Sequence, residues 1–203
     1  MAPTPSFEAM IPVFKRERLL LLDVDNHIDV RNAVGFAEAQ KVDYVLLGAE
    51  GAADELDFLK EHKARVIIVS PCKVAESQAE DMPIDGLRRL PAKLHAKGIP
   101  FALSSTVANG INPRLLPYEA GTAAAYGLPK DVALKSVTLA PAQLLGVDKE
   151  LGSLDAGKRA NIVIADGDIL EPGTSVLRMF INGEPVDLET EEARTFEYYK
   201  SRR

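Results

Sequence analysis

The chain alternates short apolar runs with amphipathic segments, and this alternation constrains its fold more than any other feature. The apolar runs read RLLLLDVD, DYVLLGA, ARVIIVSP and IPFALSST, at residues 18–25, 43–49, 64–71 and 99–106. Continuous apolar runs of this length are typical of strands that are buried on both faces of a parallel sheet. We therefore expect parallel strands at these four places.

Segments with helical spacing separate the apolar runs. Apolar residues recur every three or four positions within residues 26–41, and residues 51–63 and 86–98 are amphipathic in the same way. A polar loop at residues 72–85 precedes the last of these helices. Strands that alternate with helices in this way indicate an α/β fold, with helices packed on a parallel sheet.

The pattern becomes helical after Ser105. An Ala-rich helix is expected at residues 117–127 and a longer one at residues 128–146. A β unit follows, with strands at residues 160–168 and 176–188.

Two features complete the β unit and the end of the chain. Asn182-Gly183 predicts a tight turn within the second strand. The last segment, residues 189–203, runs from acidic to basic residues, which suits the dipole of a helix.

Charge and composition exclude several partners. The chain has 203 residues, a net charge of −6 and no basic stripe, which argues against binding nucleic acid. No apolar run approaches the roughly 20 residues that a membrane-spanning helix needs. The first residues lack the basic start and apolar centre of a signal peptide, so we favour a cytoplasmic location. Cys72 is the only cysteine, which excludes an internal disulfide and a cysteine-based zinc site.

One motif carries a family resemblance. The sequence GSLDAGKRANIVI, at residues 152–164, places a glycine–lysine turn ahead of an apolar strand. Together with LPAKLHAKGIPFALSS at residues 90–105 and INGEPVDL at residues 181–188, it resembles the C-terminal end of the amidohydrolase superfamily. The imidazolonepropionase-like branch is the most similar.

The resemblance implies a particular fold. The four predicted strands would be strands five to eight of a TIM-like (β/α)8 metal-dependent hydrolase barrel, so that the chain forms its C-terminal half. Residues 1–150 would hold this half-barrel and the helices after it. Residues 151–188 would form part of a small composite β-sandwich, and residues 189–203 a C-terminal helix.

The resemblance also implies where metal ligands would lie. Family members hold zinc or another divalent metal with a His-x-His pair on strand one, a His on strands five and six, and an Asp on strand eight. Strand alignment places Asp23 at the strand-five His, and Gly48 or Leu47 at the strand-six His. Ser105 or Ser104 would stand at the strand-eight Asp. One carboxylate without imidazole partners is a poor zinc site, so we expect no bound cofactor.

The candidate catalytic residues are Asp23, Asp25 and Ser105, which lie at predicted strand ends. Asp23 and Asp25 are two positions apart, and alternate residues of a strand point the same way. The alternative interpretation is that these are strand-end polar groups, with Asp25 or Asn26 capping the next helix. His27 shares both interpretations with Asp23 and Asp25: part of a residual pocket or altered metal site, or a strand-end polar group. Other polar residues are interpreted as caps or solvated helix-end groups: Glu50, His62, His95, Ser104 and Thr106.

Three functions remain open. The chain is a part of an amidohydrolase that hydrolyses C–N bonds once an N-terminal half supplies metal ligands, a metal-free pseudoenzyme that binds a small molecule or a partner, or a structural fragment. We expect it to be inactive alone.

A half-barrel would leave two sheet edges unpaired and some apolar residues without facing partners, namely Leu20, Leu22, Val45, Ile67 and Phe101. We therefore expect a homodimer of two half-barrels or pairing with a separate N-terminal half. Alternatively, the N-terminal segment and the loop at residues 72–85 fold over the open face.

Overall fold

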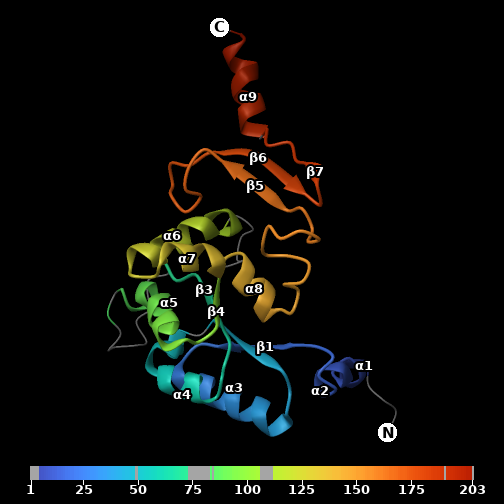
Figure 1. Ribbon diagram of the computed structural model, residues 1–203, viewed down its shortest axis with the longest axis vertical. Helices are drawn as coiled ribbons and strands as arrows, with labels where there is room; N and C mark the ends of the chain where they lie inside the picture. Colours follow the sequence, from blue (N-terminus) through green and yellow to red (C-terminus); the bar gives the residue numbers. More distant parts are fainter. Residues whose placement is uncertain are drawn as a thin grey trace.

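A four-stranded parallel sheet forms the centre of the molecule (Figure 1). The computed structural model describes residues 5–48, 50–72, 83, 85–105, 112–189 and 191–202. The strands are hydrogen-bonded in chain order: β1 (Leu20–Val24), β2 (Tyr44–Gly48), β3 (Val66–Val69) and β4 (Phe101–Ser104). The α/β fold with a parallel sheet is confirmed, and each strand lies within its predicted segment.

Helices connect the strands and follow the last one. Between strands lie α3 (His27–Gln40), η1 (Glu50–Asp54), α4 (Leu56–Glu61) and α5 (Gly86–Lys97). After β4 come η2 (Asn112–Leu115), α6 (Leu116–Ala125), α7 (Lys130–Ser136) and α8 (Leu139–Leu144). Two short helices, α1 (Pro5–Glu8) and α2 (Ile11–Phe14), precede β1.

One face of the sheet packs on the helices and forms the main core. Leu46 and Val66 stand opposite each other on β2 and β3, and both are fully buried. Val34 of α3 and Leu90 of α5 belong to the same apolar cluster. Because strand residues alternate between faces, every second residue of β1 to β4 points into this core.

The opposite face of the sheet is covered by α8 over part of its area. Val45, Ile67 and Ala102 form a second cluster with Leu144 of α8, and all four are buried. The expectation that Val45, Ile67 and Phe101 lack facing partners is therefore wrong. Leu144 covers the first two, and Phe101 is buried on the helix-covered face.

The cover stops short of β1, the edge strand. Leu20 and Leu22 are half-buried beside Val13 of α2, and Leu21, on the opposite face, is 46% exposed. β1 pairs with β2 alone among the described strands.

A separate antiparallel sheet follows, made of β5 (Ile162–Ala165), β6 (Val176–Ile181) and β7 (Glu184–Pro185). Asn182 and Gly183 have φ angles of 52° and 84°, which confirms the predicted two-residue hairpin turn. The last helix, α9 (Glu191–Lys200), projects away from this sheet (Figure 1).

A loop joins the antiparallel sheet to the helices. Leu170, in the segment between β5 and β6, is buried in the main core, and its carbonyl lies against Gly121 of α6. Lys130 of α7 pairs with Asp168 at 3.0 Å and with Glu171 at 3.1 Å. The sheet is thus attached through an apolar anchor flanked by exposed ion pairs.

Two helices predicted as continuous are each divided. The segment at residues 51–63 forms η1 and α4, and Glu55 between them is buried and accepts a 2.7 Å hydrogen bond from Arg31. The segment at residues 128–146 forms α7 and α8. Pro141 lacks an N–H and its ring clashes with the carbonyl four residues earlier, which prevents a helix from running through Val137.

Replacing Leu46 by Ala tests the main core. Leu46 is fully buried on a central strand, so Leu46→Ala should lower the free energy of unfolding by about 2–5 kcal/mol. Leu154→Ala is the matched control: Leu154 is 81% exposed, and its loss should change stability by less than about 0.5 kcal/mol. Urea denaturation followed by circular dichroism measures both, and equal effects would contradict this placement of the core.

Candidate functional site

The candidate site residues lie at the carboxyl ends of the parallel strands, along the side of the sheet where these ends meet. These ends are where ligands bind in α/β folds. Asp23 stands opposite Leu47 in the β1–β2 pairing and is exposed. It lies on the face opposite the main core, because its neighbours Leu22 and Val24 both belong to that core.

Asp25 lies beyond the end of β1, so strand alternation does not align its side chain with that of Asp23. The next residue, Asn26, is the N-cap of α3 and accepts hydrogen bonds from the N–H groups of Ile28 at 2.9 Å and Asp29 at 3.0 Å. Asp25 and Asn26 are the two predicted caps of this helix, and the structure shows that Asn26 is the cap.

A close contact holds this turn in place. The N–H of Gly51, in η1, donates to the carbonyl of Asp25 at 3.0 Å. A Cβ at Gly51 would overlap the backbone of Asn26 and His27. The β1–α3 turn and η1 therefore pack backbone against backbone, which fixes where Asp25 lies.

The backbone at Gly48 does not accommodate a metal-binding histidine without strain. Its φ angle is 91°, in the region that favours glycine, and a Cβ there would lie 2.7 Å from the carbonyl oxygen of Val24. The same Cβ would lie 3.3 Å from a carboxylate oxygen of Asp23. The side chain beside Asp23 on the neighbouring strand is therefore the apolar one of Leu47.

The two candidate serines differ in their surroundings. Ser104 ends β4 on the same face as Ala102, and it is half-buried. Ser105 follows the strand and is 7% exposed. The role of Ser105 stays a prediction, and Thr106 lies outside the described residues.

The three histidines lie on separate helical elements. His27 begins α3 and is exposed, and His95 is exposed in the last turn of α5. His62 follows α4, where its Nδ1 lies 2.7 Å from Glu38 and its ring stacks beside Phe58. None of them stands beside Asp23.

Glu119 is a buried acid that the sequence analysis did not single out. It lies in the first turn of α6 and is 8% exposed. Burial raises the pKa of Glu119 to about 7, although a hydrogen bond from Ser70 opposes this shift. Its Oε2 atom is buried without a hydrogen-bond partner. The only signal in the sequence is its position beside Ala120 and Ala123, on the helix face with small residues.

The donor set does not fit the metal that the family resemblance implies. Across the residues that the structure describes, no three His, Cys, Asp or Glu side chains gather closely enough to hold a metal ion. Asp23 alone, beside Leu47, offers one carboxylate where zinc requires several ligands. In the same part of the chain, no helix is both long and apolar enough to span a membrane.

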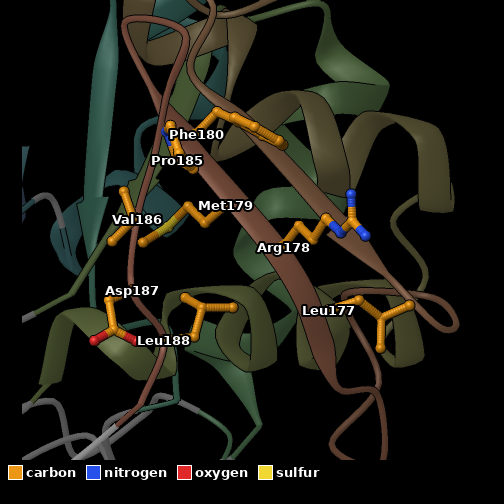
Figure 2. Close-up of a pocket in the computed structure, with 8 residues that line it drawn as sticks. All are labelled: Leu177, Arg178, Met179, Phe180, Pro185, Val186, Asp187 and Leu188. Carbon is orange, nitrogen blue, oxygen red and sulfur yellow. The ribbon is translucent and has the colours of Figure 1, made fainter.

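A shallow pocket of about 390 Å³ lies elsewhere, on the antiparallel sheet (Figure 2). Figure 2 shows the side chains of Met179, Val186 and Leu188 lining it between β6 and the segment after β7. The N–H of Val186 donates to the carbonyl of Met179 at 2.9 Å, which continues the pairing of the two segments. The lining is largely apolar, with Arg178 and Asp187 as its charged residues.

Comparison with known proteins identifies the family. The sequence matches the amidohydrolase family over residues 22–186. The chain therefore belongs to the amidohydrolase family, as the resemblance at residues 152–164 suggested.

Two relatives match part of the chain. Amidohydrolase tasK of Hapsidospora irregularis is 39% identical over 89 residues, which cover 41% of this chain and 9% of that protein. N-acetylglucosamine-6-phosphate deacetylase of Caenorhabditis elegans is 35% identical over 92 residues, which cover 44% of this chain and 22% of that protein.

Solved structures share the fold. An amidohydrolase from Thermotoga maritima superposes with a TM-score of 0.83 over 92% of this chain and 48% of its own, at 23% identity. A Xaa-Pro dipeptidase with bound methionine superposes with a TM-score of 0.59 over 82% of this chain and 44% of its own, at 18% identity. This chain thus spans less than half the length of each of these structures.

The motif at residues 152–164 has a structural role in this fold. Gly152 has a φ angle of 92°, and a Cβ there would lie 2.8 Å from the Cβ of Ala142 in α8. Lys158 is mostly buried, donates to the hydroxyl of Ser153 and pairs with Asp155 at 3.4 Å. The motif joins α8 to the antiparallel sheet.

Replacing Gly51 by Ala tests the contact that fixes the candidate site. Gly51→Ala should lower the free energy of unfolding by about 1–3 kcal/mol. The added methyl group would overlap backbone atoms, which cannot move aside as a side chain can by changing its rotamer. Gly35→Ala, in the middle of α3, is the control. Nothing lies within 4 Å of its added Cβ, so it should raise stability by about 0.5–1 kcal/mol. Effects of the same sign in a urea titration would contradict the packed turn.

Proposed function

We propose that this chain is the C-terminal half of an amidohydrolase barrel and does not hydrolyse amides by itself. The observation that carries the proposal is the set of side chains at the strand ends. Asp23, Leu47 and the serines stand where the family resemblance places metal ligands. A single carboxylate is a poor zinc site, and without the metal the water loses the lowered pKa on which the family's hydrolysis depends.

The half-barrel part of the proposal is supported by the sheet itself. Its four parallel strands follow chain order, and β1 and β4 each have one neighbour among the described strands. An eight-stranded barrel has no such edges. The superposition on 48% of the Thermotoga maritima amidohydrolase agrees with half of a barrel fold.

A hydrolysis assay tests the missing activity. The substrates are N-acetylglucosamine 6-phosphate, Xaa-Pro dipeptides and N-acyl amino acids, each with added zinc or manganese. The first two follow from the substrates that the names of the similar proteins give. We expect turnover at the level of the buffer and less than one zinc per chain by elemental analysis.

A control variant separates a true activity from contamination. Asp43 precedes β2 at the other end of the sheet and is exposed, so Asp43→Asn matches Asp23→Asn in chemistry. Turnover that is present in the wild type and Asp43→Asn but absent in Asp23→Asn would show that the chain is an enzyme after all.

The proposal includes a partner that completes the fold. Phe7, Met10, Ile11 and Phe14 are exposed at helical spacing on the segment beside the β1 edge, and Leu21 is exposed on β1 itself. On the antiparallel sheet, Val163, Leu177 and Ile181 are each half exposed or more. Such patches mark surfaces that other polypeptide covers, either a second copy or an N-terminal half.

Light scattering on a sizing column tests this association. We expect wild-type protein to elute above its monomer mass of 22.0 kDa at micromolar concentration. Leu21→Asp should reduce the association, because it puts a charge on the open edge strand, whereas Leu154→Asp should not. A monomer with a cooperative melting transition would contradict the partner.

A further inference from the structure

The carboxyl group of Glu119 links α6 to the ends of β3 and β4. Ser70 follows β3 with a φ angle of 48°, and its N–H donates to the carbonyl of Ser104 at 2.7 Å. The same residue is hydrogen-bonded through its side chain to Glu119. One serine therefore joins both strand ends to the helix.

The environment of Glu119 opposes a negative charge. Glu119 is buried, as are its helix neighbours Ala120 and Ala123, which belong to the main core, and its Oε2 receives no hydrogen bond. A buried carboxylate with an unpaired oxygen loses its hydration without replacement, which favours the protonated form. The N-terminus of α6 and the Ser70 hydroxyl favour the charged form, but burial is the stronger effect.

No charged side chain offsets this burial in the described part of the chain. Charged residues on the elements packed against α6 are Arg88, Arg89, Lys93, His95 and Lys97 on α5, Lys130, Asp131 and Lys135 on α7, and Arg114 on η2. Five of them are in ion pairs: Arg89 with Asp85, Lys97 with Asp57, Lys130 with Asp168 and Glu171, and Lys135 and Asp131 with each other. The causes that set the pKa of Glu119 are burial and Ser70.

We infer that Glu119 and Ser70 form a proton-linked latch that holds α6 against the ends of β3 and β4. With the proton on Glu119, the helix packs closely on the strand ends. Loss of the proton leaves a buried charge whose Oε2 is unpaired, and α6 moves away from the strand ends so that water reaches this oxygen. The latch acts at the carboxyl ends of the parallel strands, where Ser104 and Ser105 also lie.

The direction of the pH effect follows from the raised pKa. The folded chain keeps the proton of Glu119 up to about pH 7, whereas the unfolded chain releases it near the ordinary value of 4.5. Stability from this group is therefore complete below pH 4.5 and falls as the pH rises to about 7. The acids Asp57, Asp85 and Asp131 have lowered pKa values, because each accepts a hydrogen bond from a basic side chain, and their contribution to stability changes only in more acidic solution.

The test compares wild type with Glu119→Gln, which keeps the shape of the neutral acid. Between pH 4.5 and pH 8 the unfolding constant of the wild type should rise relative to that of the variant by up to about 300-fold. Urea titrations across this range measure the difference. Glu184→Gln is the control, because Glu184 is exposed on β7, and its pH profile should follow that of the wild type.

Two further measurements assign the effect to the latch. Ser70→Ala removes the hydrogen bond that favours the charged form, so the titration of the Glu119 carboxyl carbon in the NMR spectrum should move to higher pH. Hydrogen exchange of the N–H groups of Ser70 and Tyr126 should quicken as Glu119 ionises, more than that of Leu46. A Glu119 titration near pH 4.5, or identical pH profiles for wild type and Glu119→Gln, would overturn the latch.

Discussion

A parallel sheet needs cover on both faces, and the rest of this structure depends on how that need is met. Parallel strands carry apolar side chains on both sides, because each crossover places a helix against the sheet. Here the helices cover one face, and Leu46 and Val66 on that face are fully buried. On the other face Leu144 of α8 covers Val45 and Ile67, and the cover ends before Leu21. The edge at β1 is therefore where the fold leaves apolar surface open.

The sequence predicts the strands well because their signal is local. A run of four or five apolar residues between polar segments favours a buried strand, and each predicted run contains an observed strand. The caps follow the same rule, since Asn26 accepts from two N–H groups that the helix itself leaves unpaired. Local chemistry decides both, so one sequence is enough to find them.

Other features depend on contacts between distant residues. Glu55, between η1 and α4, accepts from Arg31, 24 positions away, and Val45 is covered by Leu144. Glu119 looks like an ordinary acid in the first turn of a helix until α6 is placed against Ser70. At the candidate site, the sequence correctly places Asp23 and Ser104 at strand ends. It cannot show that Asp25 lies past the strand or that Gly48 needs a left-handed backbone.

The segment that carries the family resemblance has a structural role and lies apart from the strand ends. Gly152, Ser153 and Lys158 belong to the junction between α8 and the antiparallel sheet. A side chain at Gly152 would meet α8, so packing alone requires a glycine there. Catalysis in this class of fold depends on the strand ends, where this chain carries Asp23 beside Leu47. Family membership rests on the match over residues 22–186, whereas an activity depends on the side chains at the ends of β1 to β4.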